Sequence, residues 1–314
     1  MKQCLYCYNP LMNNEIDFHA LCSKKIFGSD VVPELPYLDE DMQTLATEII
    51  RNQIAVTGVQ AKLSLEITSS KPKEKKRFTI VGLWGGYILK PQTTDYVHLP
   101  EVEDLTMHLA ELAKIQAVPH SLIRMKSGTL AYITKRLDRN GSKKIQMEDM
   151  CQLTERLTEH KYHSSYENIA KVILKYSVFP ILDEITFYEQ IVFSFLTGNA
   201  DMHLKNFSLL KWNTQGYRLM PAYDMVATAI VNPADKEELA LTLNGKKRKL
   251  NKSDFQKAFA LNGLDEKRIE SLLSKFSKAI PIWIEFVQMS FLPEAMKAQY
   301  IELIMERAKR LEIV

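Results

Sequence analysis

The sequence predicts an α+β protein of two lobes, in which strands dominate the first lobe and helices the second. Short β-prone runs bounded by turn residues recur up to Leu137, whereas from Met147 onward apolar residues recur at helical spacing. A polar turn at Asn140-Gly141 separates the two patterns. With 314 residues, 46% of them hydrophobic, the chain is long enough to bury a sizeable core, and its length suits either one large two-lobed domain or two ordinary domains. We therefore expect an N-terminal segment over residues 1–30, a first lobe over 31–137 and a helical second lobe over 138–314.

Composition and charge exclude several classes of protein. The net charge of +3 is too small to predict nucleic-acid binding from the global balance. The sequence has no run of eighteen apolar residues, and its beginning lacks the apolar core of a signal peptide. We expect a cytoplasmic protein without a membrane partner, although export as an effector stays open.

The first thirty residues hold a pattern typical of a metal site. Cys4-x-x-Cys7 is followed by His19-x-x-Cys22, a set that suits a tetrahedral structural zinc ion. The turn signal at residues 9–10 could fold the second pair back onto the first. The alternative is a set of buried thiols in which His19 only begins a helix.

Two segments of the first lobe could bind phosphate groups. Prolines in residues 29–41 indicate a linker into a helix over 42–51. Gly58 then lies in a strand-turn-strand pattern, where backbone amides could approach a phosphate and Lys62 could add charge. A simple hairpin or bulge explains the same glycine.

The second segment is the strand over residues 85–91, which ends in a lysine. Lys90 could bind the phosphates of a nucleotide, or it could be a surface lysine on an edge strand. A helix is expected over 100–114, because its apolar residues recur every three or four positions. Glu103 in its first turn is a helix-terminus charge, the partner of Lys90, or both.

In the second lobe, the acidic residues 148–149 should form the first turn of a helix that carries Cys151 as a buried thiol. Further helices are predicted over 166–176, over 183–197 and from 252 to the end. The helix over 183–197 leads to Asp201 and Asn206 in a D-x-x-x-x-N arrangement. A hairpin over 207–223 should bring Asp224 back to the same place. This set suits phosphoryl transfer, with Asp201 as base and with Asn206 and Asp224 as Mg²⁺ ligands. An ordinary loop rich in Asp and Asn is the alternative.

Taken together, these segments resemble the HipA-like serine/threonine kinases, the toxin components of bacterial toxin–antitoxin systems. The matching strings are TGVQAKLSL, YILKP, VEDLTMHLAEL, ITKRLDR, QMEDMCQ with Lys161-Tyr162, TGNADMHLKNFSLL, PAYDMVAT and LNGKKRK. The resemblance implies a two-lobed kinase-like fold of the divergent, lipid-kinase-like sort. It also implies ATP and Mg²⁺ as ligands, and phosphorylation of a protein, in this family an aminoacyl-tRNA synthetase, with arrest of translation and growth.

The resemblance also assigns residues. The Asp201, Asn206 and Asp224 roles agree with those above, and residues 135–137 would form the hinge that meets adenine. The nucleotide-binding set implied is Thr57, Gly58, Val59, Gln60, Lys62, Lys90, Glu103, Lys135, Leu137 and His203.

Three departures from the family pattern matter. First, full-length members carry an additional N-terminal subdomain ahead of the glycine loop, and this sequence resembles the short HipT form that lacks it. The resemblance to HipT implies a separately encoded small partner and a DNA-binding antitoxin. Contact with DNA is then expected only through that complex. Lys135 replaces an acidic hinge residue. Family members phosphorylate serines before the glycine loop, where this chain has Ala55 and Thr57. Either Thr57 is the acceptor, or the mechanism is lost, or Ala55 is an engineered replacement.

Two other readings stay open. The first is a small-molecule phosphotransferase of the aminoglycoside type, which shares the D-x-x-x-x-N loop. The second is an inactive kinase-fold binding module, in which the basic loop over residues 243–249 and the cysteine-rich segment contact nucleic acid or an antitoxin complex.

Overall fold

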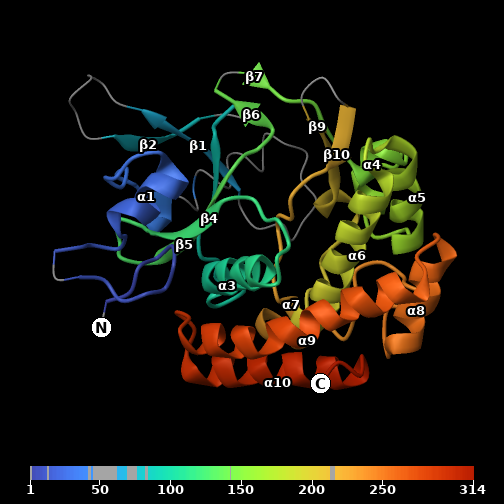
Figure 1. Cartoon of the computed structure of the whole chain (residues 1–314). Coiled ribbons are helices and arrows are strands. Elements are labelled where there is room, and N and C mark those ends of the chain that lie inside the picture. The colour runs from blue at the N-terminus through green and yellow to red at the C-terminus, as the bar shows by residue number, and fades with distance from the viewer. Residues whose placement is uncertain are drawn as a thin grey trace. The chain divides into compact units, whose positions relative to one another are not determined.

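The computed structural model describes residues 2–12, 14–41, 44, 62–68, 76–81, 84–141, 143–212 and 216–314. The chain forms two compact units (Figure 1). The first unit comprises Met1–Asp104 and Val118–Lys144, and the second comprises Leu105–Ala117 and Ile145–Val314. The helix predicted over 42–51, apart from Thr44, and the glycine segment over 55–61 lie outside the described residues.

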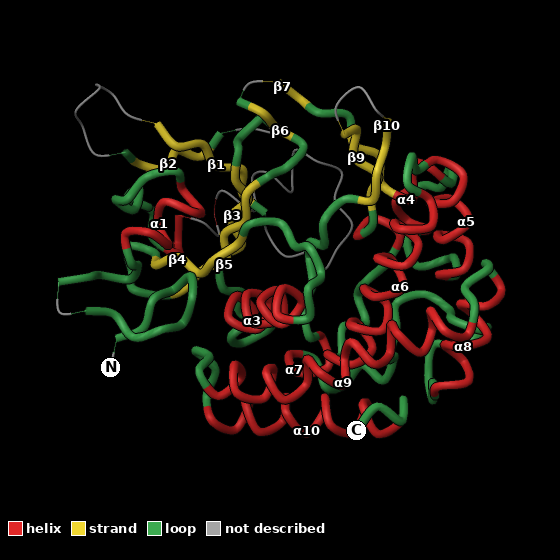
Figure 2. The backbone as a smooth tube through the Cα atoms, viewed as in Figure 1, coloured by secondary structure: helices red, strands yellow, loops and turns green. Residues whose placement is uncertain are grey.

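A five-stranded antiparallel sheet forms the centre of the first unit (Figure 2). Its strand order is β2-β1-β3-β5-β4, so the strand that carries Lys90 is central and not an edge strand. The strands are β1 (Leu63–Thr68), β2 (Arg77–Ile80), β3 (Tyr87–Lys90), β4 (His120–Arg124) and β5 (Leu130–Lys135). A small hairpin of β6 (Arg139–Asn140) and β7 (Lys143–Lys144) follows.

The N-terminal segment packs on this sheet. Helix α1 (Ala20–Phe27) places Phe27 against Phe78, with the ring centroids 5.7 Å apart. Leu5 accepts hydrogen bonds through its carbonyl oxygen from the backbone of Leu122 and the hydroxyl of Ser121. The first thirty residues are therefore part of the first unit's fold and are held to β4.

Helices make up most of the second unit. They are α4 (Met150–Leu153), α5 (Tyr166–Tyr176), α6 (Pro180–Thr197), α7 (Thr228–Val231), α8 (Lys252–Leu261), α9 (Glu266–Gln288) and α10 (Glu294–Arg310). Helix α3 (Leu99–Leu112) begins in the first unit and continues into the second. A three-stranded sheet of order β10-β9-β8 completes the unit, with β8 (Met147–Asp149), β9 (Ser208–Trp212) and β10 (Gly216–Leu219). Two short 3₁₀ helices lie at Thr158–His160 and Leu204–Asn206.

Helix α6 is the core of the second unit because most of its side chains are buried. Phe193 packs edge-on against Trp283 of α9, with centroids 5.5 Å apart. The indole N–H of Trp283 donates to the Leu109 carbonyl over 2.8 Å, which satisfies the polar atom of a fully buried ring. The aromatic packing fixes the position of α6 and therefore the point at which the following loop begins.

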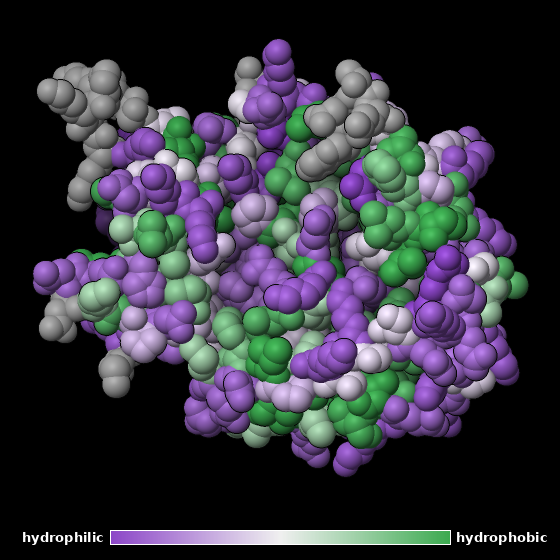
Figure 3. Space-filling view, viewed as in Figure 1, coloured by the Kyte–Doolittle hydropathy of each residue, from purple (hydrophilic) through white to green (hydrophobic). Residues whose placement is uncertain are grey.

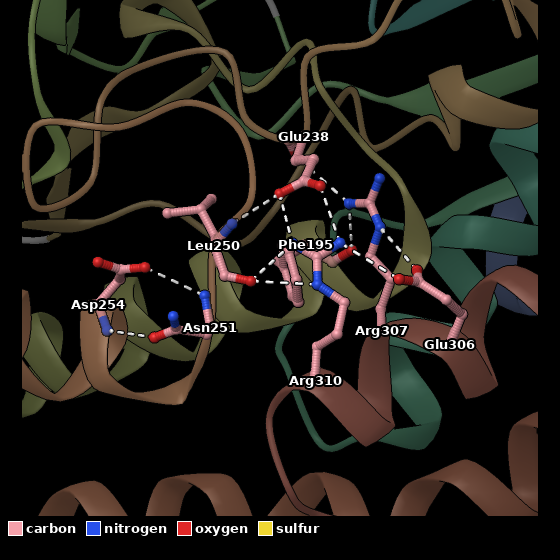
Figure 4. Close-up of polar contacts among 8 residues, drawn as sticks. All are labelled: Phe195, Glu238, Leu250, Asn251, Asp254, Glu306, Arg307 and Arg310. Atoms are coloured by element: carbon pink, nitrogen blue, oxygen red, sulfur yellow. Dashed lines mark hydrogen bonds and ion pairs between the residues drawn. The ribbon is translucent and has the colours of Figure 1, made fainter.

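A polar cluster ties the C-terminal end of α10 to residues 238–250 (Figure 4). Arg310 donates to both carboxylate oxygens of Glu238 over 2.8 Å, and also to the Leu250 carbonyl. Arg307 donates to the Phe195 carbonyl over 2.8 Å. Although burial raises the pKa of Glu238, hydrogen bonds from Arg310 and Leu250 outweigh it and hold the pKa below its ordinary value. The last helix therefore anchors both α6 and the segment after α7.

Hydrophobic side chains gather on the surface over α5 and the start of α6 (Figure 3). Val178, Phe179, Ile181 and Leu182 are 38 to 54% exposed, although they lie within five consecutive positions. Contiguous exposed apolar groups are less common than scattered ones on a soluble surface. The connection between α5 and α6 thus presents an apolar surface on the second unit.

Two local predictions are wrong. Residues 147–149 form strand β8, and the helix begins only at Met150, because Asp149 caps it through a reciprocal pair of bonds with Gln152. Strand β10 ends at Leu219, so Asp224 lies five residues beyond the hairpin and not at its end. The helix predicted over 166–176 is confirmed. None of the described helices is long and apolar enough to cross a membrane.

Candidate active site

A glycine begins the loop that holds Asp201. Gly198 ends α6 in the left-handed region, with φ of 72°, and its N–H bonds back to the last turn. A Cβ atom at this position would approach Leu303 to 2.5 Å and Ala229 to 2.9 Å. Both the backbone conformation and the lack of space require glycine here.

Hydrogen bonds fold residues 199–206 into one rigid loop. The Asn206 amide nitrogen donates to the Asp201 carbonyl over 2.8 Å, and the His203 N–H donates to the same carbonyl over 2.8 Å. The Asp201 N–H in turn donates to the Asn199 side chain over 3.1 Å. Because the Asn206 nitrogen is donating inward, its oxygen Oδ1 is the atom suited to a cation. The D-x-x-x-x-N spacing thus has a structural cause.

The Asp201 carboxylate faces both protein and solvent. Its side chain is 47% exposed, and the Tyr162 hydroxyl donates to Oδ1 over 2.6 Å. His203 Nε2 lies 4.0 Å from the same oxygen and packs edge-on against the Tyr162 ring. Burial lowers the pKa of His203 to about 4, so the imidazole is neutral at pH 7 and makes no ion pair with Asp201.

Asp224 belongs to the same neighbourhood. Its charge is one of the influences on the pKa of His203, so the two side chains interact electrostatically. Its φ of 57° is in the left-handed region, which is uncommon for any residue but glycine. The preceding Tyr223 fixes this turn, because its hydroxyl bonds to Ser208 over 2.6 Å and donates to the Lys205 carbonyl over 2.9 Å.

In the first unit, Lys90 and Glu103 form a buried ion pair. Lys90 is 3% exposed and Glu103 is fully buried, and the lysine ammonium contacts the carboxylate directly. The ammonium also lies 5.3 Å from the centre of the Tyr132 ring. The surface-lysine alternative is therefore wrong, and Glu103 is the partner of Lys90.

The other predicted nucleotide-binding residues divide into two groups. Thr57, Gly58, Val59 and Gln60 lie outside the described residues, as does Ala55, and Lys62 is exposed just before β1. At the predicted hinge, the N–H groups of Lys135 and Arg136 donate to the carbonyls of Pro119 and Gly86, each over 2.8 Å. Both amides are thus engaged within the first unit, whereas Leu137 is half-buried.

The structure brings the predicted metal ligands of the N-terminal segment together. The ligand atoms of Cys4, Cys7, His19 and Cys22 all lie within 4.8 Å of one another. The fourth cysteine, Cys151, is buried in α4 as predicted.

Sequence reasoning gave no role to Tyr162. It appeared only in the Lys161-Tyr162 string of the family resemblance, and the contact with Asp201 joins residues 39 positions apart. The adjacent Lys161 and Tyr162 ahead of the D-x-x-x-x-N loop were the only feature of the sequence that could have pointed to this contact.

Comparison with known proteins places the fold in a class. The chain superposes on the Shewanella oneidensis HipA toxin, solved with HipB and operator DNA, with a TM-score of 0.69 and 22% identity over 82% of this chain and 65% of that one. It also matches the Helicobacter pylori proinflammatory kinase CtkA, with a TM-score of 0.53 and 16% identity over 72% of this chain and 87% of that one. The protein therefore has a kinase-like fold.

The family follows from sequence. The family model of the HipA-like C-terminal domain matches residues 54–284, so the chain belongs to that family. Curated relatives are a "Putative kinase" of Haemophilus influenzae (26% identical, 73% of this chain and 69% of the relative) and "Putative kinase Y4dM" of Sinorhizobium fredii (28% identical, 69% of this chain and 56% of the relative). A second Sinorhizobium fredii relative, "Putative kinase Y4mE", is 24% identical over 82% of this chain and 63% of its own length. The chain thus spans between 56 and 69% of these three relatives.

Proposed function

We propose that the protein is an ATP-dependent serine/threonine kinase that acts as the toxin of a bacterial toxin–antitoxin system in the cytoplasm. The observation that carries the proposal is the loop in which Asp201, held by Tyr162, and Asn206 are locked together by hydrogen bonds. Membership of the HipA-like family and the kinase-like fold support it.

The donor set fits the ligands that a kinase needs. The Asn206 amide oxygen and the Asp224 carboxylate are hard oxygen ligands of the kind that Mg²⁺ prefers, and they would hold it. Lys90, positioned by Glu103, would bind phosphate oxygens. When bound, ATP with Mg²⁺ supplies the phosphoryl group that is transferred.

Asp201 is the base in this proposal. Its carboxylate would accept the proton of an incoming serine or threonine hydroxyl, since nearly half of the side chain is open to solvent. Tyr162 fixes the orientation of the carboxylate through Oδ1, which leaves Oδ2 for the acceptor. Neutral His203 adds no positive charge beside Asp201, so it does not weaken the base.

The acceptor and the partners rest on the family resemblance. We place an aminoacyl-tRNA synthetase as the target, and a separately encoded small protein together with a DNA-binding antitoxin as partners. The HipA neighbour, solved with HipB and operator DNA, supports an antitoxin of that type. Regulation would act through phosphorylation of Thr57.

Phosphoproteomic mass spectrometry tests the proposal. A bacterial lysate is incubated with ATP, Mg²⁺ and either the unmodified chain or the Asp201→Asn variant. A phosphoserine or phosphothreonine site that only the unmodified chain produces supports a protein kinase and identifies its target. Phosphate found on an added aminoglycoside instead would favour the small-molecule phosphotransferase. No new phosphate on any acceptor would favour the binding module.

A further inference from the structure

The Cys₃His cluster, formed by Cys4, Cys7, His19 and Cys22, has the dimensions of a zinc tetrahedron. Ideal bond lengths of about 2.3 Å to sulfur and about 2.0 Å to nitrogen give sulfur–nitrogen edges of about 3.5 Å in a tetrahedron. The Nδ1 atom of His19 lies 3.4 Å from the Cys7 sulfur and 3.7 Å from the Cys22 sulfur. All four ligand atoms are within 4.8 Å of one another, without any change of backbone.

An independent observation concerns the other nitrogen of His19. Nε2 lies 3.1 Å from the carbonyl oxygen of Pro10, an atom that can only accept a hydrogen bond. Nε2 therefore carries a proton, which in the neutral ring leaves the lone pair of Nδ1 directed at the sulfur atoms. A carbonyl that fixes the tautomer of a histidine in this way is the usual support of a zinc ligand.

Local structure presents the ligands from two short elements. The Cys4–Cys7 pair lies in a tight turn closed by the Tyr8 N–H, which donates to the Cys4 carbonyl over 2.9 Å. His19 is the N-cap of α1, and Cys22 lies in the first turn of that helix. A turn with two cysteines that faces a helix with two further ligands is an arrangement of closed, structural zinc sites.

Hydrogen bonds and an ion pair hold the segment that carries the cluster to the rest of the first unit. Tyr8, next to Cys7, donates from its hydroxyl to the buried Asp104 carboxylate over 2.8 Å. Asp104 also bonds to His120 of β4 over 2.7 Å, and it follows Glu103 directly in the chain. On the other side of the turn, Asp17 forms an ion pair with Arg124 at 2.9 Å. The turn is thus fixed both to β4 and to the start of α3.

We propose that the Cys₃His cluster binds one structural Zn²⁺, and that the ion holds Tyr8 against Asp104 so that α3 presents Glu103 to Lys90. Three soft sulfur ligands and one imidazole select zinc over the hard cations of a phosphotransfer site. The site is closed by four protein ligands, so its task is stability and not catalysis. Zinc binding itself does not depend on whether the protein transfers phosphate, whereas the test of the link to Glu103 through phosphotransfer rests on the proposed function.

Elemental analysis tests the proposal on full-length protein purified without added zinc. We expect one zinc per chain in the unmodified protein and in Cys151→Ser, a matched control that removes a buried thiol outside the cluster. Cys7→Ser and His19→Gln should lose most of the zinc and unfold at a lower temperature. Zinc well below one per chain in the unmodified protein overturns the proposal, and so does full zinc retention in both cluster variants.

A second measurement covers variants that fail to fold. Cobalt exchanged into the unmodified protein should give the strong visible absorption of a tetrahedral thiolate site, and a zinc chelator should lower the unfolding temperature of the zinc form. Absence of the cobalt bands, or a disulfide between two of the three cysteines in non-reducing mass spectrometry, contradicts the proposal. Loss of zinc without loss of phosphotransfer would remove only the link to Glu103.

Discussion

Replacement of Lys90 by Met tests the buried ion pair between Lys90 and Glu103. The ammonium lies against Glu103, which is fully buried, and both groups belong to the first unit. Methionine fills a similar volume but carries no charge. The variant therefore leaves the Glu103 carboxylate in a site from which water is excluded.

The expected loss of stability is large. Removal of one partner of a buried ion pair costs about 3–5 kcal/mol, because the remaining charge is left uncompensated. The double variant Lys90→Met/Glu103→Leu removes both charges, and we expect it to recover at least about 2 kcal/mol of that loss. Lys126→Met, at an exposed lysine of the same unit, should change stability by less than about 0.5 kcal/mol.

Urea unfolding followed by circular dichroism measures these free energies, and hydrogen exchange of β3 and β5 peptides locates the loss. Single variants whose losses simply add in the double variant would refute the coupling. A loss below about 1 kcal/mol for Lys90→Met would show that Glu103 does not depend on this partner. Phosphotransfer should be lost in Lys90→Met, in the single variant Glu103→Leu and in the double variant, because the proposed phosphate ligand or its support is gone.

Three further predictions concern the second unit. Tyr162→Phe should lower the phosphate-transfer rate by about 3- to 10-fold, since Asp201 loses the hydroxyl that orients it. Burial raises the pKa of Glu184 to about 7, so the folded state loses stability as the pH rises from about 4.5 through 7. Glu184→Gln should therefore raise the unfolding temperature at pH 8 but not at pH 4. Arg310→Met should cost about 2 kcal/mol, because Glu238 keeps its charge but loses two donors.

Each of these predictions has a control. Tyr176→Phe, at an exposed tyrosine, should leave the transfer rate unchanged, and an equal loss in both tyrosine variants would contradict the role of Tyr162. Thermal unfolding across pH checks Glu184, and a gain that is the same at pH 4 and pH 8 would exclude a charge effect. Lys309 is exposed beside Arg310, and Lys309→Met should leave the free energy of unfolding unchanged. An equal loss of stability in Lys309→Met and Arg310→Met would show that the charge of α10 matters and the contact with Glu238 does not.

Local sequence patterns predicted the elements whose formation is local. The helix over 166–176 and the strand that ends at Lys90 follow from side-chain spacing within one element. Strand β8 was missed because three residues are too few for a periodic signal, and the acidic pair before α4 reads as a first helical turn. The cysteine and histidine pairs were predicted from spacing because their ligands lie close along the chain.

Contacts between distant residues were beyond sequence reasoning. Tyr8 meets Asp104 across 96 positions, and Arg310 meets Glu238 across 72. Nothing in the local pattern distinguishes these residues from solvated tyrosines and arginines. The sequence could not decide whether Glu103 is the partner of Lys90. The structure decides it, because both side chains are buried and in direct contact.

The most direct test of the proposed activity is the initial rate of γ-phosphate transfer from labelled ATP with Mg²⁺. The rate is compared between the unmodified chain and Asp201→Asn under conditions where both bind ATP equally. We predict that the unmodified chain labels a protein and that the variant, which keeps the loop geometry but lacks the base, loses at least about 100-fold of the rate. Equal rates in the two proteins, or no transfer by the unmodified chain while it binds ATP, would contradict the account.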